Sequence, residues 1–222
     1  MAHSTGPEIV IDPQGNEHVA IDFNDDYEGG VFGYWLFIFT ELMMFGAMFM
    51  IFGIYFNMYT DDFIKSSADH MNVTLGGINT VVLLLSAYMM GLAMMKLEKS
   101  DHDGSIKFIW YTIALSVVFL IIKAFEWSHD IHLGIFPGDP VLESMSKGAN
   151  LYFGMYFSMT GLHGVHIAVG IAFMLWAIKS IKAGEIGGHR PIFMKNLTLY
   201  WDFVHLVWVF LFPLYYMIGG SV

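Results

Sequence analysis

Five long apolar stretches constrain this chain more than any other feature of its sequence. They lie near residues 31–55, 75–97, 108–127, 151–178 and 197–218. A helix needs about 20 apolar residues to cross the hydrocarbon core of a bilayer, and each stretch reaches that length. None shows the alternation of a barrel strand, and backbone groups in lipid must be bonded within their own segment. We therefore expect five transmembrane helices.

The composition agrees with a membrane protein. Of the 222 residues, 56% are hydrophobic and only 14% are charged, which leaves too little polar surface to coat a soluble globule. We predict an all-α, polytopic membrane protein whose five-helix domain covers residues 31–222. The chain has no cysteine, so it cannot itself build a thiolate-ligated copper centre, an iron–sulfur cluster or a c-type haem attachment.

Residues 1–30 form an acidic polar tail. The tail has seven carboxylates and no Lys or Arg, and it lacks the basic start and apolar core of a signal peptide. We expect it to lack a stable fold unless a partner holds it. The formal net charge of -10 reflects this tail and the outer loops, and gives no indication of nucleic-acid binding.

Basic residues in the connections predict the orientation of the helices. One side of the membrane receives the larger set, Lys96, Lys99, Lys107, Lys179, Lys182, Arg190 and Lys195. The other side receives Lys65 and Lys147, and at most Lys123 in addition. Basic residues favour the cytoplasmic side. The sequence therefore predicts a cytoplasmic N-terminus and a C-terminus outside.

Glu41 lies deep within the first apolar stretch. It is about 15 Å along a helix from Val31 and about 21 Å from Tyr55, close to the middle of a bilayer. An ionisable group at that depth is costly and requires a partner or a function. Glu41 is either a proton-relay or helix-locking acid, or a neutral acid held by structural hydrogen bonds.

Lys123 and Glu126 are three residues apart near the outer end of the third helix. This spacing lets them meet on one helix face. They form either an internally neutralised pair or a contact with another subunit.

Asp202 and His205 repeat the same spacing in the last helix, next to Trp201 and Trp208. A carboxylate one turn from an imidazole fixes its tautomer and suits either proton traffic or a structural hydrogen bond. Pro213 follows, and we expect a kink in the outer half of this helix.

His163 and His166 lie in TGLHGVH, within the fourth helix. They are about one turn apart and can both face inward. The same helix contains Gly161, Gly164 and Gly170, and small residues of this kind let a neighbouring helix approach closely. A bis-histidine haem takes one imidazole from each side of the ring, usually from different helices. Two histidines on one helix cannot supply both, so we expect neither haem nor copper in this chain.

SHDIH, residues 128–132, offers His129, Asp130 and His132 after the third helix. Without a fourth ligand we interpret this segment as a solvated loop and not as a metal site. The sequence holds no phosphate-binding loop, nucleophile elbow or HExxH pattern.

Five motifs, in order, resemble subunit III of the haem–copper oxidases. They are TELMMF at 40–45, LGGINTVVLLLSAY at 75–88, KAFEW at 123–127, TGLHGVHIAVG at 160–170 and YWDFVHLVWVFLFP at 200–213. The resemblance runs from about Gly33 to the end of the chain. It is to the short bacterial form with five helices.

The resemblance implies a helical bundle split by a lipid-holding cleft, docked beside the catalytic subunit I in a bacterial inner membrane. It implies that haems and copper belong to partner subunits and that this chain supports proton uptake and the durability of subunit I. By the same resemblance, Glu41 is the midmembrane acid of the family, Glu126 its following acid, and His163 and His166 its paired histidines.

The chain departs from the family pattern at three places. The family usually reads His-Phe-Val-Asp in the last helix, whereas Asp202 and His205 stand here in the reverse order. Lys123 stands where many members have Gln, and Val31 replaces a common basic residue.

The loss of that basic residue affects the expected lipid contacts. Another cation must then meet a phospholipid headgroup, because phosphate is bound by Lys and Arg. We expect Lys179, Lys182 or Arg190 to do so.

Three alternatives remain open at the level of sequence. The chain could be a subunit-III-like accessory protein of a nitric oxide reductase, or a five-helix dihaem anchor that oxidises quinol, although its histidines do not suit the anchor. A small transporter would need broken helices or internal repeats, and neither is evident. If the chain belongs to an oxidase, the electron donor, cytochrome c or quinol, belongs to other subunits.

Overall fold

The computed structural model describes residues 9–11, 17–19, 27–184, 186 and 192–221. Five helices in this part are long and apolar enough to cross a membrane, which confirms the predicted number and class. They are α1 (Tyr27–Met58), α3 (Val73–Glu98), α4 (His102–His132), α6 (Lys147–Lys182) and α7 (Ile192–Phe212).

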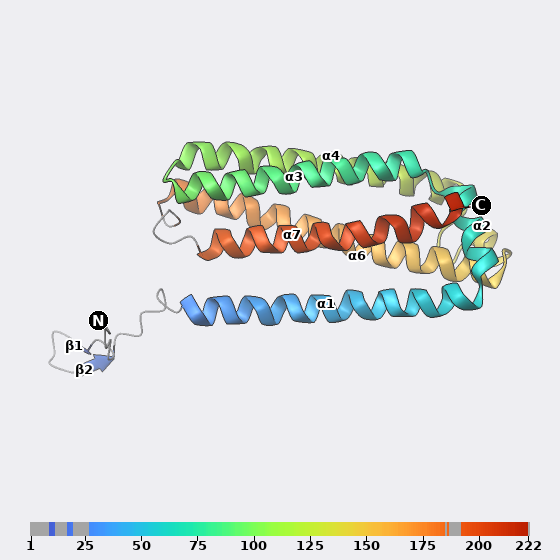
Figure 1. Ribbon diagram of the computed structural model, residues 1–222, viewed down its shortest axis with the longest axis horizontal. Coiled ribbons are helices and arrows are strands. Elements are labelled where there is room, and N and C mark those ends of the chain that lie inside the picture. The colour runs from blue at the N-terminus through green and yellow to red at the C-terminus, as the bar shows by residue number, and fades with distance from the viewer. Residues whose placement is uncertain (1–8, 12–16, 20–26, 185, 187–191, 222) are drawn as a thin grey trace.

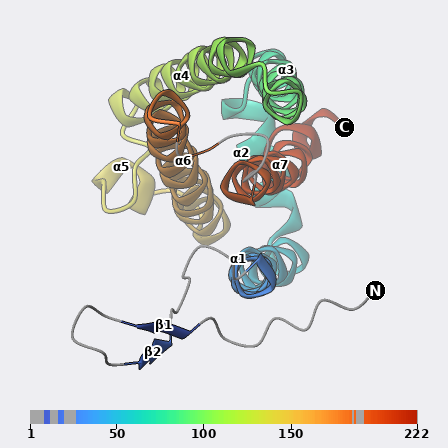
Figure 2. The ribbon, with the colours of Figure 1, turned by 90° about the vertical axis from the view of Figure 1, so that its left-hand side faces the viewer.

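The five helices run side by side as a bundle. Figures 1 and 2 show α3 and α4 on one side, α1 on the other, and α6 and α7 between them. Large apolar side chains cover the outside, among them Phe125, which is 74% exposed, and Phe32, which is 71% exposed. An apolar exterior of this extent requires lipid or protein around it, as in a polytopic membrane protein.

Polar capping residues set the helix starts. The side chain of Asn72 accepts hydrogen bonds from two backbone amides at the start of α3, and Asp101 and Ser146 each accept one at the starts of α4 and α6. Such caps satisfy amides that have no partner within the helix. The helices therefore begin before their apolar stretches.

The predicted loop at residues 128–132 is wrong. The last turns of α4 continue through these residues to His132, and Asp130 is buried with 2% exposure. The backbone there stays hydrogen-bonded, since the amide of Leu133 donates to the carbonyl of His129. Polar residues at a helix end gave the appearance of a loop.

Two short helices are additions to the prediction. α5 (Pro140–Glu143) is a single turn, and α2 (Thr60–His70) crosses one end of the bundle (Figure 1). The hydroxyl of Ser67 on α2 donates to the carbonyl of Tyr215 at 2.7 Å and accepts from the amide of Gly219 at 3.1 Å. α2 thus fastens the C-terminal segment to that end.

The last helix changes type at the predicted proline. Pro213–Met217 is a π-helix, η1, and Ile218–Ser221 is a 3-10 helix, η2. Proline lacks a backbone amide and disturbs the α-helical pattern, and π segments often occur at functional sites. η1 directs Tyr215 and Tyr216 into the core, where both are buried.

A short hairpin lies within the acidic tail. β1 (Ile9–Ile11) pairs antiparallel with β2 (Glu17–Val19), with Ile9 opposite Val19. This pairing is an addition to the expectation of a tail without a stable fold. The other residues of the segment 1–26 lie outside the described residues, as does Arg190.

Candidate functional site

A buried ion pair lies in the half of the bundle that contains α2. The Nζ of Lys123 is 3.2 Å from Oε2 of Glu126, one turn further along α4, and both side chains are less than 10% exposed. The ammonium also donates to the hydroxyls of Tyr156, at 3.0 Å, and Tyr216, at 2.7 Å. The interpretation as an internally neutralised pair is confirmed.

The same two tyrosines complete the network. The hydroxyls of Tyr156 and Tyr216 both donate to Oε1 of Glu126. All three ammonium protons therefore have acceptors, and the carboxylate has three donors. Since Tyr156 belongs to α6 and Tyr216 to η1, the pair joins three segments. Buried charges are tolerated when they are paired and fully hydrogen-bonded.

Glu41 and His166 form a second contact, between α1 and α6. The Nε2 of His166 is 3.0 Å from Oε2 of Glu41, and the two side chains are 13% and 16% exposed. The Nδ1 of His166 lies 2.8 Å from the carbonyl of Leu162, which can only accept, so Nδ1 carries a proton. A further proton is shared between Nε2 and the carboxyl, on either atom. Glu41 is thus in contact with α6 through His166.

His163 occupies a different environment, one turn away on α6. Its ring is 1% exposed and stacks on Trp208 at 5.3 Å between ring centroids. It lies nearly perpendicular to the ring of Phe119, at 5.9 Å between centroids. Neither ring nitrogen has a hydrogen-bond partner in the described part of the chain. His163 faces inward as expected, but it packs as an aromatic ring.

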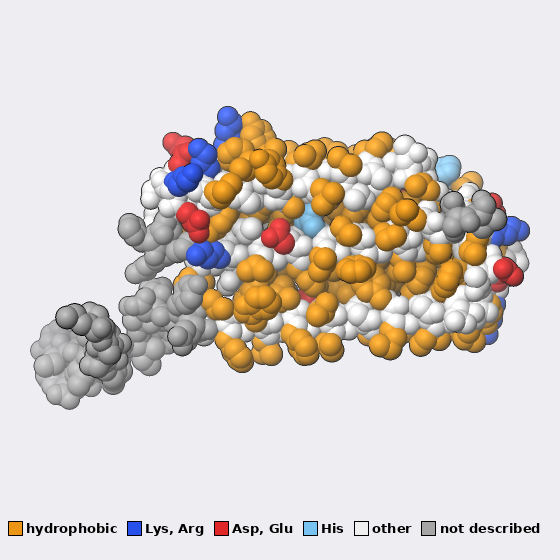
Figure 3. Space-filling view, viewed as in Figure 1, with side chains coloured by type: hydrophobic (Ala, Val, Ile, Leu, Met, Phe, Trp, Pro, Cys, Tyr) orange, Lys and Arg blue, Asp and Glu red, His pale blue; other side chains and the backbone are white. Residues whose placement is uncertain are grey.

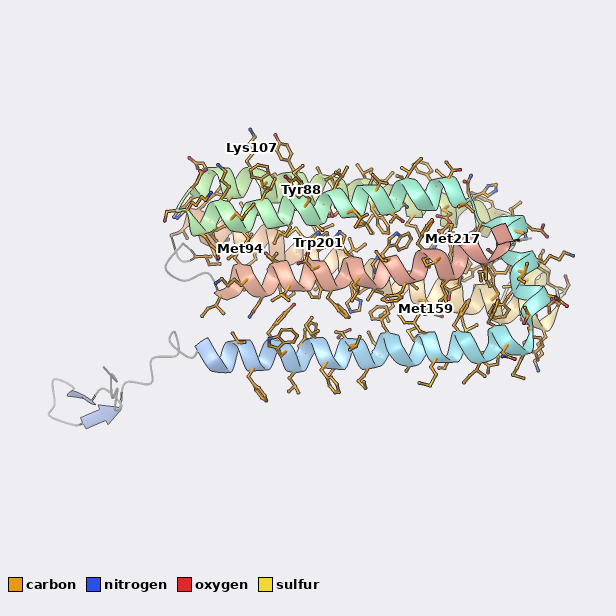
Figure 4. The ribbon with its side chains drawn as sticks, in the orientation of Figure 1. Tyr88, Met94, Lys107, Met159, Trp201 and Met217 are labelled. Carbon is orange, nitrogen blue, oxygen red and sulfur yellow. The ribbon has the colours of Figure 1, made fainter. Side chains whose placement is uncertain are left out.

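His205 is held by α3 and by its own helix. Its Nδ1 donates to the carbonyl of Trp201, and its Nε2 lies 2.8 Å from the hydroxyl of Ser86. The indole of Trp201 points toward α3 (Figure 4) and donates to the same hydroxyl at 3.2 Å. These contacts fix the tautomer of His205 without any carboxylate.

Asp202 therefore does not pair with His205, contrary to the hypothesis drawn from their spacing. Asp202 is exposed on α7, whereas His205 is 5% exposed. Of the two reversed residues, the imidazole points inward and the carboxylate points out of the bundle.

Gly170 explains part of the glycine pattern on α6. A Cβ atom added there would lie 2.6 Å from the ring of Trp201, so the indole packs directly on the helix backbone. Gly161 faces Trp127 at 3.0 Å in the same way, whereas Gly164 has open space. Close approach by a neighbour, as expected of small residues in membrane helices, occurs at two of the three positions.

The histidines are not arranged as metal ligands. Among the residues described, no three His, Asp or Glu side chains come together in a way that could hold a metal ion. His166 and His205 use both ring nitrogens for other bonds, and His163 presents its faces to aromatic rings. Asp130 is buried beside exposed His129 and His132.

An apolar groove opens between α1, α6 and α7. It has a volume of about 300 Å³ and is lined by the rings of Tyr34, Phe37, Phe173, Phe193 and Tyr200. The exposed Lys179 and Lys182 lie in the last turn of α6, beyond Phe173. Phe173 and Lys179 are about 9 Å apart along the helix axis.

Comparison with known proteins gives a consistent result. The family described as cytochrome c oxidase subunit III matches residues 22–220. A cytochrome bo(3) ubiquinol oxidase subunit 3 from Pseudomonas aeruginosa is 26% identical over 93% of this chain and 92% of its own length. A cytochrome c oxidase subunit 3 from Thermostichus vulcanus is 25% identical over 94% of this chain and 97% of its own.

A third relative is longer. A heme-copper oxidase subunit I+III from Aeropyrum pernix is 25% identical over 83% of this chain, which corresponds to 22% of that protein. The resemblance found in the motifs is therefore confirmed over nearly the whole sequence.

Proposed function

Because the chain belongs to the cytochrome c oxidase subunit III family, we propose that it is the non-catalytic subunit III of a terminal haem–copper oxidase. Such a complex reduces oxygen to water and pumps protons. The match over residues 22–220 carries the proposal, since it includes all five membrane helices. The chain's part is to stabilise subunit I, hold phospholipid and support proton uptake.

The chemistry of the intramembrane histidines supports a role without a redox centre. Haem and copper need imidazole nitrogens that converge on one point. His205 and His166 each direct a nitrogen to their own helix backbone, and their other nitrogens meet Ser86 and Glu41. The haems and copper of the complex then belong to partner subunits.

Subunit I is the proposed neighbour. The Aeropyrum pernix relative is described as subunit I+III in a single chain, and linkage of this kind favours direct packing of the two parts. Relatives named for quinol and for cytochrome c occur at similar identity, so the proposal holds for either electron donor.

The membrane orientation follows from the positive charges. We place the chain in a bacterial inner membrane with its N-terminus in the cytoplasm. The ends of α6 and α3 then lie on the cytoplasmic side, where Lys179, Lys182 and Lys96 stand in their last turns. The end crossed by α2 faces outside.

Phospholipid binding is proposed for the groove between α1, α6 and α7. Five of its seven lining residues are aromatic. Only 11% of the most apolar window of α1 is buried, so most of that helix is open to lipid. Lys179 and Lys182 supply positive charge for a headgroup phosphate.

The subunit composition of the complex tests the proposal. The chain is tagged, extracted in mild detergent and purified from its native membrane. We expect a histidine-rich, haem-containing polypeptide and bound phospholipid to copurify with it. Purification without any haem-containing partner would contradict the proposal.

A further inference from the structure

One face of α7 remains open in the bundle. Its exposed residues recur every three or four positions, which places them along one side of the helix. They are Leu199, Asp202, Leu206, Val209 and Phe210 on α7, and the exposed positions continue on η1 with Pro213 and Met217. We call this set the α7 stripe. Figure 3 shows an acidic side chain among hydrophobic ones where α7 runs, and Asp202 is the one carboxylate in the sequence of that helix.

Asp202 lies inside the membrane span and not at its edge. The span runs from Ile192 to Met217, and Lys195 near its start forms an exposed ion pair with Glu98 at the end of α3. Asp202 is two turns deeper than Lys195, about 10 Å along the axis. A carboxyl at this depth has no water to solvate it.

The described residues offer Asp202 no hydrogen bond or ion pair. Its electrostatic neighbour on α1 is Tyr34, whose hydroxyl is buried and itself lacks a hydrogen-bond partner among the described residues. Polar groups in lipid are rare without a partner, and they usually mark an interface or a polar path. No described side chain donates to Asp202 in this arrangement, and a helix packed on the exposed side of α7 can supply the donor.

We propose that the α7 stripe is the docking surface for a transmembrane helix of a partner oxidase subunit, which places a hydrogen-bond donor against the carboxyl of Asp202. The inference rests on the proposed function and adds the surface and the contact through which the subunit associates.

A protein helix fits this surface better than lipid does. Acyl chains carry no donor, and headgroups lie at the interface, about 10 Å from Asp202. Polar side chains hydrogen-bond across helices in membranes, and a stripe with a spacing of three and four residues matches the contact line of two packed helices. The flanking Leu206 and Val209 supply the apolar part of that contact.

A second copy of this chain fits less well. In a symmetric dimer the same patch meets itself, so the acid of one stripe would approach the acid of the other. Two carboxyls in lipid do not satisfy each other unless they bind a shared proton. A partner with a donor, such as an Arg, Lys, Trp or hydroxyl side chain, is complementary to the stripe.

Site-directed crosslinking tests the docking surface, because the chain has no cysteine of its own. Leu206→Cys places a thiol on the stripe, and Phe125→Cys places the control thiol on the exposed face of α4. In the native membrane, the introduced thiol of each variant is labelled with a benzophenone maleimide. Irradiation then forms the crosslinks, and the products are identified by mass spectrometry. We expect at least a fivefold higher yield of crosslinks to another oxidase subunit from position 206 than from position 125.

Crosslinks from position 206 only to lipid, or only to a second copy, would overturn the proposal. If the unaltered chain copurifies with oxidase subunits while position 206 contacts none of them, the docking surface fails and the proposed function stands. If no oxidase subunit copurifies at all, both fail.

A second measurement tests the carboxyl itself. Asp202→Leu removes every hydrogen-bonding atom, whereas Asp202→Asn keeps an acceptor of the same shape. We expect the fraction of partner subunit retained after detergent washing to fall at least threefold for the leucine variant and less than twofold for the asparagine variant. Both chains should keep the tryptophan emission of the unaltered protein, since Asp202 makes no internal bond. Full retention in the leucine variant would refute the contact.

Discussion

Lys123→Met removes the cation from the buried network and leaves its other members in place. Glu126 keeps two hydroxyl donors, from Tyr156 and Tyr216, but loses its counter-charge in a site less than 10% exposed. Breaking one half of a buried ion pair costs about 3–5 kcal/mol. We expect the upper part of this range because all three ammonium protons are used and three aromatic rings lie within 5.4 Å of Nζ.

A double-mutant cycle isolates the pair. Lys123→Met combined with Glu126→Gln removes both charges, so the double variant should be more stable than Lys123→Met alone by at least about 1 kcal/mol. The assay is unfolding of the full chain by SDS in mixed micelles, followed by tryptophan emission. The control is Lys195→Met, which breaks an exposed pair with Glu98 and should cost at most about 1 kcal/mol. A cost for Lys123→Met no larger than the control, or strictly additive effects, would mean that the buried pair does not stabilise the bundle.

Three further predictions follow from other contacts. Gly170→Ala should destabilise the chain by about 1–3 kcal/mol in the same SDS titration, because the added Cβ would lie 2.6 Å from a buried indole. The control is Gly164→Ala, where the added Cβ has nothing within 4 Å; it should be neutral or stabilising by up to about 1 kcal/mol. Burial lowers the pKa of His70 from its usual 6.5, against the opposing effect of a neighbouring carboxylate. As the pH falls from about 7.5 to about 5.5 the unfolded chain takes up this proton first, so stability should decrease, and His70→Gln should flatten that dependence; an unchanged slope would argue against it. A hydrophobic carbodiimide should modify Glu41 in preference to Glu126. Glu41 shares a proton with His166 and is 16% exposed, whereas Glu126 is paired with an ammonium. Peptide mapping that finds only Glu126 labelled would contradict this.

The transmembrane helices could be predicted because length and apolarity are properties of the sequence alone. Their ends could not, since Asp101 and Ser146 cap helices that begin well before the apolar stretches. α2 gave no apolar signal: it is a polar helix held by tertiary contacts, and Phe63 is its fully buried anchor. Tertiary packing stabilises such a segment more than its own propensity does.

The candidate site was predictable where its partners are close in sequence. The pair of Lys123 and Glu126 follows from a spacing of three residues, but Tyr216, which completes it, is 90 residues away from Glu126. Glu41 and His166 are 125 residues apart. Their similar depth in two predicted helices was the one signal that could have paired them.

The hypothesis on the last helix failed for a different reason. Asp202 and His205 have the spacing of a pair, yet the imidazole is bonded to a backbone carbonyl of its own helix and to Ser86 on α3. Local spacing shows which groups can meet. The neighbouring helix decides which contact forms.

We propose that the chain belongs to an oxidase complex and carries no redox centre itself. The most direct measurement is a reduced-minus-oxidised absorbance spectrum of the purified complex, repeated on the two fractions after this chain has been dissociated with a stronger detergent. We expect the haem signal to stay with the remaining subunits and the separated chain to show no Soret band. We also expect the depleted complex to lose activity faster during turnover. Stoichiometric haem in the separated chain would contradict the proposal.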